Sequence, residues 1–392
     1  MTHRSRTNRT SRSWGKLALL GATALSATGA LGAGVAEAED QPIEVSIGGD
    51  YQAAMGIIDQ DSDDGELADD TNSIAFGQDL EIYVTGSATF DNGLTAGFSA
   101  AIEGDAEGDD SETLDERFVF FRGNFGQFRL GATEDARQEL TNFAPNGSSI
   151  FGVNTPSFLF ADAGNAVDIF SVTTYDDLLG SEDSIKLVYF SPSFEGFTFG
   201  LSYAPSDEGQ SQYGANARGV DGQLLDQWSA GVAFEREFGD IGLRVAGGYS
   251  GYTLDRCGTT AGAQNCEGSP ASWHGGATVT FGQVSVGGGY MTRDLVVNTL
   301  TGQGRDRDDY EVGIAYTVED AWAVGLQYGA VRQDGLDGLD ESFDMVALNG
   351  SYALGPGVTV EAQLDFGSFD DDTPGSLDNE FIEFMVGTAL AF

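Results

Sequence analysis

The chain ends in EFIEFMVGTALAF (Glu380–Phe392), a stretch whose residues alternate in character. One parity is mostly large and apolar, and the other holds Glu383 and the small residues. Successive side chains of a β-strand point to opposite faces of the sheet. The stretch is therefore predicted to be a strand with one apolar face and one mixed face, closed by the aromatic Phe392.

Segments of the same kind recur along the chain, and sixteen of them are predicted to be strands. They cover residues 43–56, 75–90, 94–104, 115–125, 127–134, 184–190, 197–205, 226–238, 241–253, 272–282, 283–292, 308–318, 321–333, 342–354, 357–367 and 380–392. Short connections with turn residues, such as Asp91-Asn92-Gly93, alternate with longer acidic ones, such as Arg293–Arg307. An even number of strands with short turns at one end and long loops at the other is typical of a bacterial transmembrane barrel.

Two other architectures, a transmembrane helix and a soluble β-sandwich or jelly roll, fit the sequence less well than the barrel. After Val35 no stretch approaches the about 18 consecutive apolar residues of a transmembrane helix, so only a closed barrel could span a membrane. A soluble β-sandwich or jelly roll would not usually need so many hairpins in one meander. We therefore predict an all-β fold, a 16-stranded antiparallel transmembrane β-barrel with an inward-folded third loop.

The N-terminus carries the features of an export signal. Arg4 to Lys16 form a basic region, Leu17 to Val35 are apolar and small, and Ala36-Glu37-Ala38 is a small-x-small cleavage site. The alternative is an uncleaved membrane anchor. We predict a cleaved signal peptide over residues 1–38 and a single barrel domain over residues 39–392.

The mature chain is strongly acidic. Removing the signal leaves 13 basic against 61 acidic residues, a net charge of −48, which makes nucleic-acid binding improbable. Catalysis is not expected either, because His274 is the single histidine after the signal and Gly-x-Ser-x-Gly is absent. Asp59–Gly65 resembles a calcium loop with its glycine misplaced, so only loosely bound Ca²⁺ or Mg²⁺ on acidic loops is expected, and no required cofactor.

Two cysteines stand nine positions apart, at Cys257 and Cys266, in a glycine-rich stretch. An exported chain meets an oxidising compartment, which favours a structural disulfide between them. Metal binding is the weaker alternative because the two thiols lack a nearby histidine pair.

One connection is much longer than the others, at residues 135–183. It is too apolar for a disordered segment, and a loop of this length is usually functional. We predict that it folds into the lumen and constricts it, with its acidic residues facing cations on the wall across a transverse field. The predicted pore-lining residues are Asp162, Asp168, Asp176, Asp177, Glu182 and Asp183 on the acidic side and Arg117, Arg129, Arg137 and Lys186 on the basic side.

Two motifs next to this connection carry a family resemblance. Arg117-Phe-Val-Phe-Phe-Arg-Gly-Asn-Phe-Gly-Gln-Phe-Arg-Leu-Gly131 resembles the strand–turn–strand before the constriction loop of Gram-negative general porins. The stretch from Tyr189 to Pro205 is similar to the hairpin that follows that loop, especially in the alphaproteobacterial branch. The resemblance implies an outer-membrane homotrimer in which the third loop constricts each pore, although this chain has fewer wall arginines than the family commonly has.

The expected function is passive diffusion of small hydrophilic solutes and ions, with a preference for cations. The alternatives are a substrate-selective channel and a structural or adhesive barrel whose loops bind a partner. Outer-membrane lipid and lipopolysaccharide are the expected surroundings, and Phe392 is the expected assembly signal.

Overall fold

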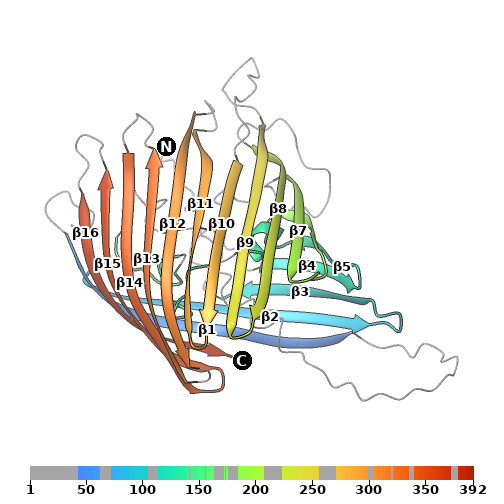
Figure 1. The fold of residues 1–392 in the computed structure, drawn as a ribbon, viewed down its shortest axis with the longest axis horizontal. Helices are drawn as coiled ribbons and strands as arrows, with labels where there is room; N and C mark the ends of the chain where they lie inside the picture. Colours follow the sequence, from blue (N-terminus) through green and yellow to red (C-terminus); the bar gives the residue numbers. More distant parts are fainter. Residues whose placement is uncertain are drawn as a thin grey trace.

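The computed structural model describes residues 43–61, 72–104, 114–141, 143–154, 156–162, 172, 174, 184–206, 223–255, 271–298, 303–318, 321–334, 340–371 and 378–392. These residues form a closed antiparallel barrel of sixteen strands, in which each strand pairs with its neighbours in sequence and β1 pairs with β16. Figure 1 shows the strands from β16 to β7 following one another around the sheet in sequence order. The predicted fold class and strand number are therefore confirmed.

Every predicted strand is present, most with ends shifted by a few residues. The strands are β1 (Glu44–Gln60), β2 (Ile74–Thr89), β3 (Thr95–Glu103), β4 (Leu114–Gly123), β5 (Gly126–Ala132), β6 (Ile185–Phe190), β7 (Phe197–Ser206), β8 (Gln223–Phe238), β9 (Ile241–Asp255), β10 (Ala271–Phe281), β11 (Val284–Asn298), β12 (Gln303–Val318), β13 (Trp322–Asp334), β14 (Asp340–Gly355), β15 (Val358–Asp371) and β16 (Asn379–Ala391). A four-residue helix, α2 (Ala136–Glu139), follows β5.

The C-terminal strand closes the barrel. The Phe392 amide donates to the Gly49 carbonyl and the Gly49 amide donates to the Phe392 carbonyl, each at 3.0 Å. In β16 the large apolar parity is outside, with Ile382 47% exposed, whereas Glu383 on the other parity is fully buried inside the barrel. The alternation of the terminal stretch therefore predicted both faces correctly.

Glycines with positive φ make the short turns. Gly93, in the turn between β2 and β3, has φ +80°, and Gly282, between β10 and β11, has φ +59°. A Cβ at either position would meet nothing within 4 Å, so glycine is favoured there for its backbone conformation rather than for space.

One predicted connection is wrong. Most of the segment from Arg293 to Arg307, expected to be a loop, belongs to β11 and β12, and these two residues face each other across the pair. Charged residues suggested solvent, but Arg293 and Arg307 point into the barrel and both contact Asp309. The strands thus continue because the charges on their inner parity are paired.

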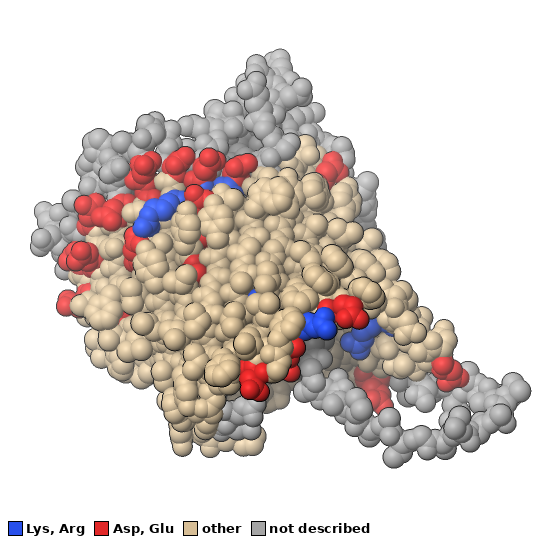
Figure 2. Space-filling view, viewed as in Figure 1, with Lys and Arg blue, Asp and Glu red and all other residues tan. Residues whose placement is uncertain are grey.

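The outer surface is apolar, with acidic residues near the end that carries the long loops. Outward residues such as Val312, Leu326 and Leu348 are 49–56% exposed. Tyrosines mark the upper edge of this surface, and Tyr203 and Tyr290 donate hydrogen bonds to Asp226 and Asp308, each at 2.7 Å. Figure 2 shows acidic side chains in a row above this largely uncharged belt. A lipid-facing band bordered by aromatic residues is typical of outer-membrane barrels.

Some predictions cannot be compared with the structure. The signal peptide at residues 1–38 and the cysteines Cys257 and Cys266 lie outside the described residues. Among the residues that are described, no helix is both long and apolar enough to cross a membrane.

Candidate functional site

The connection between β5 and β6, residues 133–184, is called the inner loop below. Its described part lies against wall residues of the parity that faces the barrel interior. Its apolar side chains are buried there: Ile150, Phe151 and Phe158 form a cluster with Ala54 of β1 and Met385 of β16. The prediction of an apolar loop packed on the inner wall therefore agrees with the described contacts.

Wall carboxylates hold the backbone of the inner loop. Three inward glutamates, each 1% exposed or less, accept hydrogen bonds from loop amides. The pairs are Ala144 N with Glu311 Oε1 of β12 at 3.0 Å, Ser149 N with Glu361 Oε2 of β15 at 2.7 Å, and Phe160 N with Glu383 Oε1 of β16 at 3.0 Å. An irregular segment offers unpaired amides, and buried amides need acceptors. These carboxylates supply them.

Close backbone contact strengthens the attachment. Gly147 of the inner loop lies against Gly325 of β13, and a Cβ on Gly147 would come within 2.4 Å of the Gly325 nitrogen. The Gly147 amide donates to Asn349 Oδ1 at 2.9 Å. Two glycines at the crossing allow the loop backbone to reach the wall.

The start of the inner loop is fixed by Arg129. Its guanidinium makes two hydrogen bonds to the carboxylate of Glu139 in α2, and its side chain is buried. The guanidinium carbon also lies 5.0 Å from the ring centroids of both Phe118 and Phe190. A two-point bond combined with stacking on rings favours arginine over lysine here.

Comparison with protein families identifies the chain. A family model described as Gram-negative porin matches residues 21–372. The chain belongs to the Gram-negative porin family. It is therefore an outer-membrane protein that crosses the membrane many times with β-strands.

Solved structures with the same fold come from several bacteria. An anion-selective porin from Comamonas acidovorans has a TM-score of 0.63 and 18% identity, covering 90% of this chain and 100% of that one. The trimer form of OmpT of Vibrio cholerae has a TM-score of 0.60 and 15% identity, covering 89% and 99%. The DcaP channel of Acinetobacter baumannii has a TM-score of 0.57 and 12% identity, covering 91% and 99%. No curated protein matches the sequence.

A second arginine, Arg137 of the inner loop, is buried deep in this porin. Arg137 of α2 is fully buried, 3.7 Å from Asp135 Oδ2 and 3.5 Å from His274 Nδ1 of β10. The same Asp135 accepts from the Gln138 amide at 2.9 Å and caps α2. Arg137 thus links the helix to the neighbouring wall at β10 rather than standing free in the lumen.

The basic group that sequence reasoning missed lies on β11 and β12. Arg293, Arg307 and Asp309 are 0–1% exposed; Arg307 Nε donates to Asp309 Oδ2 at 2.9 Å, and Arg293 pairs with the same oxygen. The alternating charges of Arg305-Asp306-Arg307-Asp308-Asp309 were the available signal, because alternation within a charged run still indicates a strand.

The predicted pore residues fall into four groups. Arg129, Arg137 and Lys186 are buried inside the barrel, and the Lys186 ammonium donates to the Thr133 carbonyl. Arg117 shares the outward parity of β4 with the exposed Val119, so its assignment to the lumen is wrong. The backbone of Asp162 exchanges hydrogen bonds with Gln60, at 2.8 and 2.9 Å. The remaining acidic residues, Asp168, Asp176, Asp177, Glu182 and Asp183, lie outside the described residues.

A carboxylate triplet faces the interior on β2 to β4. Glu81, Glu103 and Asp115 each offer an oxygen, and these atoms all lie within 4.8 Å of one another. Glu81 and Asp115 are buried and Glu103 is partly exposed. Oxygen ligands at this spacing are those that Ca²⁺ and Mg²⁺ prefer, so this triplet could hold such an ion.

The charges therefore divide the inner wall. Lys186, Arg293, Arg307 and the loop residue Arg137 lie along β6 to β12, whereas the triplet lies on β2 to β4 and the loop-binding glutamates lie on β12, β15 and β16. Opposite charges on facing walls of a narrow passage create a transverse field, which orders water and acts on the dipole of a passing solute.

Proposed function

We propose that this porin forms a water-filled channel through which small hydrophilic solutes and ions diffuse passively, narrowed by the inner loop. The observation that carries the proposal is the attachment of the inner loop to the lumen wall through Glu311, Glu361 and Glu383. An adhesive or structural barrel would extend its loops outward instead. A loop held inside by three buried carboxylates serves to limit what can pass.

We further propose that the channel prefers cations. Arg129, Arg293 and Arg307 each form an ion pair with a buried or partly buried carboxylate, which offsets their charge. The carboxylate triplet contains the partly exposed Glu103 next to two buried carboxylates, in a chain of net charge −44. An uneven balance of this kind raises the local concentration of cations in a narrow passage.

Planar-bilayer recording in a salt gradient tests both proposals. We expect ohmic single-channel current steps. We also expect the reversal potential to shift toward the equilibrium potential of the cation rather than that of the anion. Glu103→Gln should move the reversal potential toward zero, whereas Asp240→Asn, which removes one charge in the β8–β9 turn, should leave it unchanged. Substituting Asp176 and Asp177 with Asn should also reduce cation preference if these residues line the pore.

Each alternative has its own outcome in this experiment. A reversal potential on the anion side would overturn the cation preference. Saturable block by one solute would favour a substrate-selective channel. Purified protein that folds but produces no steps would overturn the channel and favour a structural or adhesive barrel.

We also propose a homotrimer. The support is the fold shared with the trimer form of OmpT and the family to which the chain belongs. Light scattering of the detergent-solubilised protein, corrected for bound detergent, should give three copies, and a monomer would contradict the proposal. Binding of lipopolysaccharide, with Ca²⁺ or Mg²⁺ on the acidic loops, stays a prediction.

A further inference from the structure

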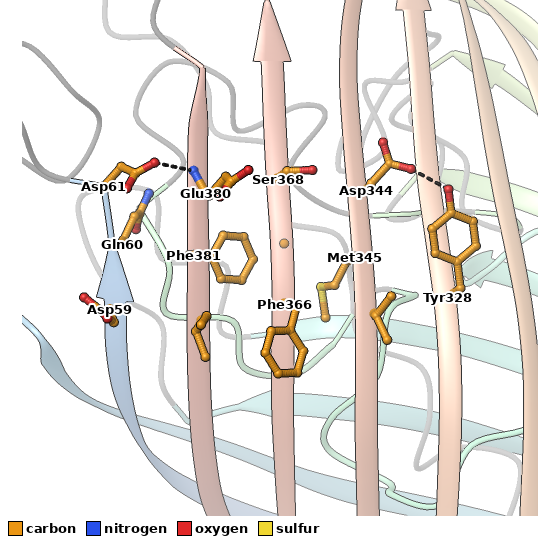
Figure 3. A pocket seen from close by; sticks show the side chains of 13 residues that line it. Asp59, Gln60, Asp61, Tyr328, Asp344, Met345, Phe366, Ser368, Glu380 and Phe381 are labelled. Carbon is orange, nitrogen blue, oxygen red and sulfur yellow. Dashed lines mark hydrogen bonds between the residues drawn. The ribbon is translucent and has the colours of Figure 1, made fainter.

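The outer face of the barrel carries a groove across β13 to β16 and the end of β1, called the outer groove below. Its volume is about 470 Å³, and it opens to the outside of the barrel. Figure 3 shows the side chains that line it, with polar groups toward the loop end of the strands and Phe366 below them. Most of its lining residues lie on the outward parity of the strands, and the inward residues Met345 and Phe381 lie beneath them.

The floor of the outer groove is apolar. Val346, Phe366 and Ile382 stand side by side in register on β14, β15 and β16, on the outward parity. They are 39–48% exposed. Tyr328 of β13 and Asp59 of β1 close the two ends of this row, because each is paired in register with its neighbour.

The outward polar residues above Phe366 form the rim of the groove, and this rim contains a hollow. The next outward residue on β15 is the small Ser368, and its partners in register, Asp344 and Glu380, are larger. The Glu380 amide donates to Asp61 Oδ2 at 3.1 Å, which places a further carboxylate at the rim. Space for a ligand therefore lies between two carboxylate-bearing strands.

The rim is left strongly negative. Asp344 is balanced, since it accepts a hydrogen bond from Tyr328 and pairs with Arg332 at 2.8 Å. Asp59, Asp61 and Glu380 are exposed, and the structure shows no ion pair for them among the described residues. The groove therefore has an apolar floor and a rim with an excess of about three negative charges.

The groove lies at the height of the membrane interface. Tyr328 and Asp344 repeat the arrangement of Tyr203 with Asp226, in which an outward tyrosine on the apolar belt donates to an aspartate above it. Tyrosine in this position marks the level of the lipid head groups. An occupant of the outer groove is thus in contact with both acyl chains and head groups.

We propose that the outer groove binds a membrane lipid with a cationic head group. The amine lies over Ser368 beside Glu380, with the exposed Asp59 and Asp61 on the β1 side of Glu380, and the first part of an acyl chain covers Phe366 and Ile382. The charge of the rim selects against an anionic head group, and the apolar floor selects against a soluble cation. The volume suits a head group with its upper methylenes, since ligand sites commonly measure about 300–1,000 Å³.

Native mass spectrometry of the intact, detergent-solubilised protein tests the proposal. The probes are lysyl-phosphatidylglycerol, phosphatidylglycerol and phosphatidylcholine with identical acyl chains. We expect the cationic lipid to be retained about tenfold more tightly than the anionic one, as for one or two partly exposed ion pairs. Glu380→Gln combined with Asp59→Asn should remove the difference.

Two variants separate charge from space. Ser368→Trp keeps every carboxylate and fills the hollow, so retention of the cationic lipid should fall to the level of phosphatidylcholine. Asp226→Asn removes an aspartate beside a tyrosine outside the outer groove and should change nothing. The gel mobility of unheated samples shows that each variant is folded.

Three results would overturn the proposal. They are equal retention of the three lipids, unchanged retention in folded Ser368→Trp protein, and preferential retention of phosphatidylglycerol that disappears with EDTA. The last would mean that a divalent cation bridges an anionic lipid to the rim. All three outcomes are independent of whether the lumen conducts.

Discussion

Glu361→Gln tests whether wall carboxylates hold the inner loop. The Glu361 carboxylate is 1% exposed and accepts hydrogen bonds from Ser149 N at 2.7 Å, Ser149 Oγ at 2.6 Å and the Ser148 hydroxyl. A glutamine of the same size keeps one oxygen and turns an NH₂ group toward at least one donor. Each hydrogen bond to a charged group contributes about 1.5–3 kcal/mol.

Loss of one or two such bonds therefore costs about 2–5 kcal/mol, and water entering the site reduces this toward the lower value. Since about 1.4 kcal/mol is a factor of ten, the detached population of the loop should rise at least about tenfold. Hydrogen exchange of peptides that cover Ser149 and Ile150 measures this directly. Faster exchange should be accompanied by more noise in the open-channel current.

Asp365→Asn is the matched control for this experiment. Asp365 lies on the same strand, faces inward and is fully buried, but its Oδ2 accepts a hydrogen bond from Gln363 Nε2 of its own strand at 2.9 Å. The variant removes the same charge without breaking a bond to the inner loop. Equal rates of amide hydrogen exchange in the two variants would show that Glu361 does not hold the inner loop. An unchanged rate at Ser149 in Glu361→Gln would show the same.

Two further predictions concern the buried charges and the glycine crossing. Asp309→Asn leaves Arg293 and Arg307 facing each other without their shared carboxylate, which should destabilise the barrel by about 3–5 kcal/mol. A lower midpoint of the heat-induced gel shift would show this, and an unchanged midpoint would contradict it. Gly147→Ala forces the inner loop off β13, because its Cβ would approach the wall backbone to 2.4 Å. The expected result is altered single-channel conductance, with Gly355→Ala, where a Cβ meets nothing within 4 Å, behaving as the parent.

Local patterns predicted the barrel well because strand alternation is a local property. In β16 the alternation alone predicts that Ile382 is on the outer face and Glu383 on the inner face, and it needs no information from the rest of the chain. The same logic failed for Arg293 and Arg307, whose charges suggested solvent although their alternation indicated a strand. It failed again for Arg117, which is close to the loop in sequence but lies on the outward parity of β4.

The contacts of the inner loop could not be predicted in this way. Ser149 and Glu361 are separated by 212 positions, and no short-range pattern relates them. A lumen carboxylate that accepts from a loop amide and one that faces water have the same sequence pattern, since both lie on the inner parity of a strand. Only the three-dimensional course of the loop distinguishes them.

That course also bears on the path of a solute. The described part of the inner loop contacts β7 to β9 through α2, then β12 and β15 through Ala144 and Ser149, and then β16 and β1 through Phe160 and Asp162. The same part of the loop also covers β2, where Phe158 lies against Gly77, and reaches β4, where the Glu134 amide donates to Glu116 Oε1 at 3.1 Å. Because the glutamates of the covered wall are occupied by loop amides, their charge acts on a passing ion only at a distance. The triplet of Glu81, Glu103 and Asp115 on β2 to β4 contains the partly exposed Glu103, so we expect it, more than the fully buried glutamates, to set the ion preference of this porin.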